Sequence, residues 1–181
     1  MIDTLLQAAK PALVPAFSLL DQAGRPFTEA NLRGHVHVVD FIFTRCPTVC
    51  PLMTAQMRTL ARQAAAQGLD LRFASFSVDP GYDSPPRLRA YAEANQIDLG
   101  RWSLVTGDAD ALEAAVTDGF HVMMGRAPDA GEDDFMSIFH GDHFVLVDAQ
   151  AQIRGYYTVV NDPQGRELLL HDAESLLRTG G

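Results

Sequence analysis

The feature that most constrains this chain is a strand signal followed directly by a helix signal. Residues 35–43, HVHVVDFIF, are β-branched and aromatic, and the run is short enough for a strand buried in the middle of a sheet. Over residues 51–67 the apolar side chains recur near the helical period, and Gly68 ends that helix. The sequence therefore predicts a buried strand, a tight connection and a helix.

The same alternation of strands and helices continues along the chain. Strands are predicted at residues 71–78, 102–105, 144–147 and 153–158, and helices at residues 86–95, 108–118 and 163–177. Residues 17–27 alternate around a turn at residues 21–24, which is typical of a β-hairpin. Residues 127–136 hold a proline, a glycine and four acidic residues, so we expect a mobile loop there.

Alternating strands and helices with short connections predict an α/β fold. The expected architecture is a mixed, mainly parallel central sheet with helices on both faces and the N-terminal β-hairpin at one edge. The 181 residues fit one domain, which we place at residues 15–181, with residues 1–14 as a leader or flexible segment. Charges and prolines interrupt residues 1–15 well short of the roughly 20 apolar residues of a membrane span, and no signal peptide or anchor is predicted there.

The segment TRCPTVCP, residues 44–51, places both cysteines of the chain, Cys46 and Cys50, at the strand-to-helix connection. In a helix, residues four apart share one face, with Cβ atoms about 5–6 Å apart. A small rearrangement would allow a disulfide, and without one both sulfurs could bind a soft metal ion. A helix N-terminus favours thiolate over thiol, which assists either chemistry.

The spacing of the cysteines favours metal binding over disulfide chemistry but does not decide between them. Thioredoxin-type redox motifs have two residues between the cysteines and this chain has three, so an efficient dithiol oxidoreductase is the less natural interpretation. The paired spacing also argues against a peroxidase, and the flanking prolines argue against an inert pair or a static disulfide. Two thiolates and one imidazole satisfy Cu(I). The candidate imidazoles belong to His35, His37, His121, His140, His143 and His171.

The motif FIFTRCPTVCP, residues 41–51, closely resembles the signature of the Sco/SenC family of copper-binding assembly factors for cytochrome c oxidase. The resemblance extends to residues 17–21, 32–34, 77–80, 83–85, 144–148 and 154–157, and so covers nearly all of the chain from about residue 15. Family members commonly have a glycine in the turn after the late strand, where this chain has Asp148-Ala-Gln-Ala151. Most also carry an N-terminal membrane anchor, which we do not find here.

This resemblance implies a thioredoxin-like fold in which Cys46, Cys50 and a distant histidine bind one copper ion, as Cu(I) and also as Cu(II). The family histidine precedes the Asp or Asn that ends the late strand by eight positions, which corresponds to His140, with His143 as the alternative. Asp79 matches a family acidic position near the site. There it would orient a ligand or a partner, or else cap the turn before Pro80.

The implied function is a metallochaperone, rather than an enzyme, that passes copper to cytochrome c oxidase subunit II or another copper protein. The alternative is a thiol-disulfide oxidoreductase in which Cys46 and Cys50 are the redox-active pair that reduces the partner's cysteines. We expect a monomer that is periplasmic or membrane-associated. A formal net charge of -9, with Lys10 as the only lysine, leaves no basic stripe and argues against nucleic-acid binding.

Overall fold

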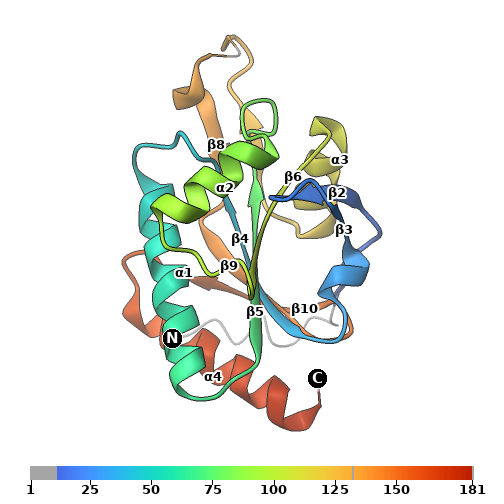
Figure 1. The fold of residues 1–181 in the computed structure, drawn as a ribbon, viewed down its shortest axis with the longest axis vertical. Helices are drawn as coiled ribbons and strands as arrows, with labels where there is room; N and C mark the ends of the chain where they lie inside the picture. The colour runs from blue at the N-terminus through green and yellow to red at the C-terminus, as the bar shows by residue number, and fades with distance from the viewer. Residues whose placement is uncertain (1–11, 132, 181) are drawn as a thin grey trace.

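The computed structural model describes residues 12–131 and 133–180. Within them, an eight-stranded sheet has the order β1-β10-β9-β4-β5-β6-β2-β3 (Figure 1). Its strand β4 (Val36–Ile42) lies between β9 (His143–Val147) and β5 (Leu71–Ser77), and every residue of β4 is buried. The predicted central strand is confirmed.

The sheet is mixed, as expected, but its strands are mainly antiparallel. Parallel pairing joins β4 to β5 and β5 to β6 (Trp102–Thr106). The antiparallel pairs are β4·β9, β9·β10 (Gln152–Thr158), β10·β1 (Ala12–Leu13), β6·β2 (Ser18–Asp21) and β2·β3 (Pro26–Thr28). The expectation of a mainly parallel sheet was wrong, because the late strands are joined by a tight turn, which permits only antiparallel neighbours. The predicted N-terminal hairpin is confirmed as β2·β3.

The turn between β9 and β10 lacks the expected glycine. Ala151 occupies it with φ of +60°, in the left-handed region that favours glycine, and its N–H donates to Asp148 O at 3.0 Å. The Asp148 side chain supports the turn, since Oδ1 accepts hydrogen bonds from the backbone N–H groups of Gln150 and Gln152, each at 3.0 Å. Aspartate therefore holds this turn in place of the missing glycine.

Helices cover both faces of the sheet, and the alternation of β4 side chains shows the two faces. Val38 points to the face packed by α1 (Val49–Ala66), α2 (Pro85–Ala94) and α4 (Pro163–Thr179). Val39 and Phe41 point to the opposite face, packed by α3 (Ala109–Ala114) and the π-helical turn η2 (Ala115–Gly119) that continues it. A 3-10 helix, η1 (Glu29–Leu32), follows β3. One sheet therefore separates two apolar cores.

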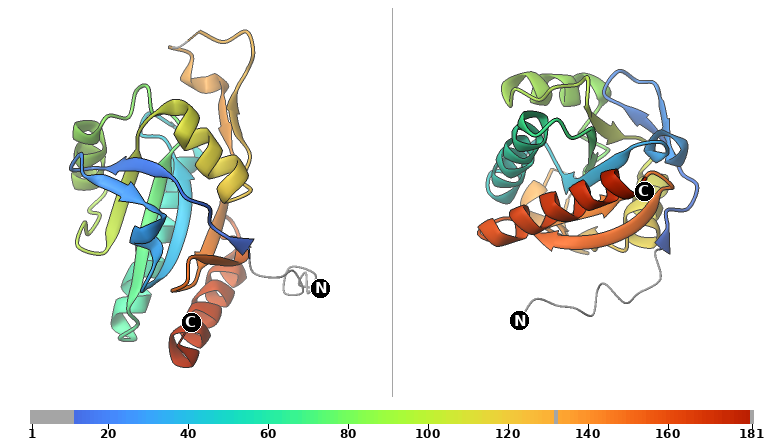
Figure 2. Two further views of the ribbon diagram at one scale, coloured as in Figure 1. Left: turned by 90° about the vertical axis from the view of Figure 1, so that its right-hand side faces the viewer. Right: turned by 90° about the horizontal axis from the view of Figure 1, so that it is seen from below.

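A second, two-stranded sheet is formed by β7 (Met124–Arg126) and β8 (Ile138–His140), with a 3-10 helix η3 (Phe135–Ser137) before β8. This hairpin projects past the main sheet at the end away from α4 (Figures 1 and 2). The sequence predicted its connection as a loop but missed both strands, because three-residue strands carry too little alternation to be recognised. The mobility of the loop stays a prediction.

The N-terminal boundary differs from the expected one. Ala12 and Leu13 pair with β10 and so belong to the sheet, and Val14 is buried in the core, although all three fell within the expected leader. Residues 1–11 of that leader lie outside the described residues. Among the described helices, none is both long and apolar enough to span a membrane.

Candidate metal and thiol site

The two cysteines lie where the central strand gives way to the first helix. Cys46 lies in the connection between β4 and α1, where its N–H donates to Phe43 O at 3.2 Å, and Cys50 lies in the first turn of α1. Both thiols are free, and Cys50 is fully buried while Cys46 keeps 8% of its surface exposed. The predicted position of the pair is therefore the one observed.

His140, at the end of β8, reaches Cys50 across 90 residues of sequence. Its Nε2 is 3.4 Å from Cys50 Sγ, and its Nδ1 is 2.9 Å from Gly141 O. Because a carbonyl oxygen can only accept, Nδ1 carries the proton and the Nε2 lone pair faces the sulfur. Phe43 supports the ring in an edge-to-face contact with centroids 5.9 Å apart.

His143 lies elsewhere, although it is only three residues away. It begins β9 opposite Thr158, is exposed, and has its Nδ1 3.7 Å from Asp142 Oδ1. The other histidines lie elsewhere: His35 pairs with Asp70, His171 pairs with Asp172, His37 Nδ1 donates to His35 O, and His121 is exposed. Across residues 12–131 and 133–180, His140 is the histidine with a ring nitrogen within hydrogen-bond distance of a cysteine sulfur.

The pKa values of Cys46, Cys50 and His140 are shifted in different directions by their surroundings. Burial raises the pKa of the Cys50 thiol far above its ordinary value. Burial opposes ionisation of Cys46 too, but backbone hydrogen bonds from Thr48 and Cys50 outweigh it and lower the pKa of Cys46. Burial lowers the pKa of His140, which keeps the imidazole neutral. Cys46 is therefore the readier thiolate, and His140 is in the form that ligates metals.

The sulfurs of Cys46 and Cys50 and the Nε2 of His140 are donors that suit a soft metal ion, although the three do not yet form a complete ligand set. In zinc sites, metal–sulfur and metal–nitrogen bonds are about 2.0–2.3 Å, so two ligands of such an ion lie about 3–4 Å apart, a range that includes the Cys50–His140 separation. Cys46 Sγ lies 3.9 Å from Thr48 Oγ1 and also interacts with the Cys50 thiol. No group of three His, Cys, Asp or Glu side chains in the described part of the chain forms a ready-made metal site.

Asp83 anchors the connection that carries Cys46. Its carboxylate is fully buried and accepts hydrogen bonds from the Thr44 backbone N–H at 3.0 Å, from the Thr44 hydroxyl, and from Ser77 Oγ at 2.7 Å. Burial raises the pKa of Asp83, while these hydrogen bonds favour its charged form. The cysteine connection is therefore tied to the end of β5.

Asp79 lies beside this anchor and is engaged by two arginines. Arg45 Nε donates to Asp79 Oδ2 at 2.7 Å, and Arg126 Nη2 donates to Oδ1 at 3.3 Å. The Arg45 guanidinium also lies over the Tyr82 ring, 4.4 Å from its centroid. Both carboxylate oxygens of Asp79 face arginines rather than the turn backbone. Its role in orienting a ligand or a partner stays a prediction.

Sequence reasoning gave no role to Arg45, Asp83 or Arg126. Arg45 and Asp83 lay inside segments already singled out, and their charges close to the cysteine motif were an available signal. No sequence signal pointed to Arg126, because the hairpin that brings it to Asp79 was not predicted.

A central strand that runs into a helix bearing paired thiols, within a mixed sheet covered by helices, defines a thioredoxin-like thiol protein. The family model described as SCO1/SenC matches residues 6–174. The chain belongs to the SCO1/SenC family.

Curated relatives and solved structures agree with this assignment. The SCO1 protein homolog of Bacillus subtilis is 34% identical over 152 residues, covering 83% of this chain and 76% of that protein. A putative copper-binding protein of Stutzerimonas stutzeri is 29% identical over 79% of this chain and 68% of its own length. Among solved structures, a SCO1/SenC family lipoprotein from Bacillus anthracis has a TM-score of 0.81 and 33% identity, covering 92% of this chain and 95% of that one. BsSco, described as a Sco family cytochrome c oxidase assembly protein with a disulfide switch, has a TM-score of 0.78 and 29% identity, covering 93% and 95%.

Proposed function

We propose that the protein binds one copper ion through Cys46, Cys50 and His140. The observation that carries the proposal is the approach of His140 Nε2 to Cys50 Sγ at 3.4 Å, with Nδ1 committed to Gly141 O. That arrangement presents a lone pair of a neutral imidazole beside a thiol at the first turn of a helix. Cys46, the thiol with the lowered pKa, interacts with the Cys50 thiol and supplies the third donor.

Copper is the metal that this donor set and the relatives favour. Two thiolates and one imidazole suit the soft Cu(I) ion, and the same imidazole provides the nitrogen ligand that Cu(II) prefers. The Stutzerimonas stutzeri relative is named for copper binding, which supports the same assignment. The buried side of the site, formed by Cys50 and Phe43, keeps water from the bound ion.

The bound copper would be cargo for the copper centre of cytochrome c oxidase subunit II or another copper protein. Support comes from BsSco, which belongs to a family of cytochrome c oxidase assembly proteins. We place the protein in the periplasm or at the membrane because its Bacillus anthracis neighbour is a lipoprotein. We expect it to act as a monomer.

Copper titration of the reduced protein against a competing Cu(I) chelator tests the proposal. Cys46→Ala and Cys50→Ala should each abolish tight binding, since one thiolate and an imidazole hold Cu(I) too weakly. His140→Ala should weaken Cu(I) binding and remove the nitrogen signature from Cu(II) spectra. His143→Ala is the matched control and should change neither. Full affinity in either cysteine variant, or loss of the nitrogen signature in His143→Ala alone, would contradict the assignment.

A second function, thiol-disulfide exchange, is favoured by the asymmetry of the two thiols. The Cys46 thiolate would attack a partner's disulfide, and Cys50 would then resolve the mixed disulfide. The protein's two thiols lose two electrons and two protons and become the Cys46–Cys50 disulfide, while the partner's disulfide becomes two thiols. Incubation of Cys50→Ala with a disulfide-bonded copper-site peptide should trap a mixed disulfide at Cys46, visible by mass spectrometry. If no mixed disulfide forms in Cys50→Ala, the proposed thiol-disulfide exchange is refuted.

A further inference from the structure

A pocket lies at the opposite end of the sheet from the cysteines. It encloses about 250 Å³ between the second half of α1, the start of β5, the start of β6 and the segment after α2. Because β4 and β5 are parallel and the cysteines follow the carboxyl end of β4, the start of β5 is the remote end. The pocket therefore belongs to a different region from the candidate copper site.

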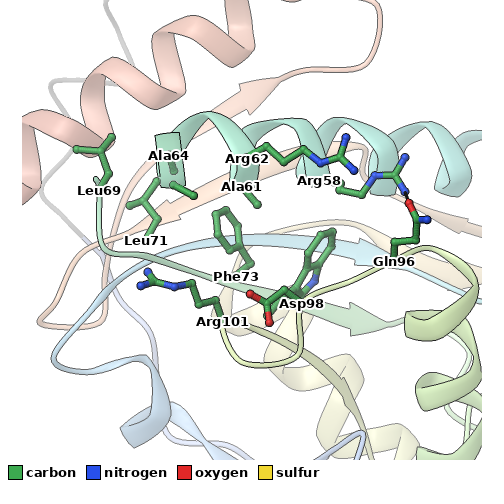
Figure 3. A pocket seen from close by; sticks show the side chains of 12 residues that line it. Arg58, Ala61, Arg62, Ala64, Leu69, Leu71, Phe73, Gln96, Asp98 and Arg101 are labelled. Atoms are coloured by element: carbon green, nitrogen blue, oxygen red, sulfur yellow. Dashed lines mark hydrogen bonds between the residues drawn. The ribbon is translucent and has the colours of Figure 1, made fainter. Parts of the chain in front are cut away.

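The floor of the pocket is apolar. Leu71 and Phe73 of β5 face Ala61 of α1 across the hollow (Figure 3). Trp102 of β6 and Ala65 of α1 also line it. Small side chains on α1 leave the hollow open, since bulkier residues there would fill it. The volume is somewhat below the 300–1,000 Å³ typical of pockets for drug-sized ligands, so the pocket suits a small molecule.

The rim of the pocket carries positive charge on one side. Arg58 and Arg62 lie four residues apart on α1, and Figure 3 shows their guanidinium groups on the same side of the hollow. Like charges at this spacing repel and destabilise a helix, and an anion between them would relieve the repulsion. Arg58 donates to Asn95 O at 2.9 Å and to Gln96 Oε1 at 3.3 Å, whereas Arg62 has no hydrogen-bond or ion-pair partner among the described residues.

The opposite rim limits the charge that the pocket accepts. Arg101 lies there, but its guanidinium already donates to Asp70 Oδ1 at 3.0 Å. Asp98 also lies on this side, and its Oδ1 accepts a hydrogen bond from the Gly100 backbone N–H at 2.9 Å. A negative carboxylate facing the hollow repels a dianion, so a single negative charge placed toward α1 fits best.

We propose that this pocket binds a small amphipathic monocarboxylate, a class of ligand independent of the copper function. Its carboxylate lies between Arg58 and Arg62, where Arg62 supplies the unengaged guanidinium donors. Its short apolar body lies over Phe73 and Trp102, which explains why a charged rim surrounds a hydrocarbon floor.

Calorimetric titration of the whole protein with octanoate tests the proposal, with emission from Trp102, the chain's single tryptophan, as a second readout. Octanoate should bind and perturb the emission, whereas octanol, which lacks the charge, and acetate, which lacks the apolar body, should each bind at least about tenfold more weakly. Equal binding of octanol would overturn the role of the arginines, and no heat and no emission change with octanoate would overturn the pocket as a carboxylate site.

Two variants locate the ligand without disturbing the fold. Arg62→Ala should weaken octanoate binding about tenfold. Ala65→Leu, at an exposed wall position, should block binding by filling the hollow while leaving both arginines in place. Arg178→Ala, which removes an exposed arginine of α4, is the matched control for net charge and should bind as the wild type does. Unchanged affinity in both pocket variants would place octanoate elsewhere and refute the proposal, while unchanged copper affinity in both would confirm that the two sites are separate.

Discussion

Asp79 and Arg126 form an ion pair that joins the two halves of the candidate site. Arg126 Nη2 lies 3.3 Å from Asp79 Oδ1, and the other oxygen of the same carboxylate is held by Arg45, the residue before Cys46. Arg126 is on β7, which pairs with β8 and so with the strand that ends at His140. The carboxylate therefore links the cysteine connection to the hairpin that carries the histidine.

Removing this link should loosen the site without removing a donor. We expect Arg126→Ala to weaken copper binding by roughly 10–100-fold, the usual cost of losing a residue that orients a ligand. The measurement is competition with a Cu(I) chelator, together with the nitrogen signature of the Cu(II) form. Arg87→Ala is the control, because the Arg87 guanidinium lies over the Tyr82 ring that Arg45 also contacts, 3.7 Å from the centroid, while its hydrogen bond goes to Tyr82 O and not to Asp79. Equal losses in the two variants would show that general packing, and not the ion pair, is responsible.

The two thiols should react in a fixed order. Because the pKa of Cys46 is lowered and burial raises that of Cys50, Cys46 holds the larger thiolate fraction at neutral pH and is also the more exposed. Brief treatment with iodoacetamide at pH 7 should therefore alkylate Cys46 first, as peptide mass spectrometry would show. Earlier alkylation of Cys50 would mean that the thiolate assignment is reversed.

Asp83 should contribute strongly to stability. Asp83→Ala leaves the Thr44 N–H and hydroxyl and the Ser77 hydroxyl without their acceptor, at about 1–3 kcal/mol for each group left buried and unpaired. Removal of the buried carboxylate also relieves its own desolvation cost, so we expect a smaller net loss of about 2–4 kcal/mol in the free energy of unfolding, measured by urea denaturation. Asp70→Ala is the comparison, since Asp70 pairs with Arg72 and Arg101 at the surface and should cost at most about 1 kcal/mol. A similar loss in both variants would contradict this account.

Asp40 should make stability fall as pH rises. Burial raises its pKa from 3.8 to about 7, and its Oδ2 has no hydrogen-bond partner, although Oδ1 accepts from Ser75. Because the folded state binds the Asp40 proton more tightly than the unfolded chain does, protonation of Asp40 stabilises the fold. This stabilisation is complete below pH 4 and is lost as pH rises toward 7. Asp40→Asn keeps the shape and removes the titration. Between pH 5 and pH 8, the free energy of unfolding of Asp40→Asn, measured by urea denaturation, should rise by a few kcal/mol relative to that of the wild type. A constant difference across this range would exclude Asp40 as the source.

Local patterns in the sequence predicted the central strand, the helix after it and the N-terminal hairpin. Residues 35–43 could form little other than a buried strand, and Gly68 ends α1 with a positive φ of 68°, as its position suggested. The place of Cys46 and Cys50 followed from those two elements alone. Local patterns did not predict the direction of the strands. β9 and β10 turn back on each other, which makes the sheet mainly antiparallel.

The sequence by itself determined the central strand and the helix after it, the position of the thiol pair and, through family resemblance, His140 as the candidate third donor. Only the tertiary structure decided which side chains meet there. The approach of His140 to Cys50 and the bridge from Asp79 to Arg126 join residues 90 and 47 positions apart. Such contacts depend on how β4, β5 and the β7·β8 hairpin are placed in space. Periodicity reports which face of an element is buried, but it carries no information about which distant residue packs against that face.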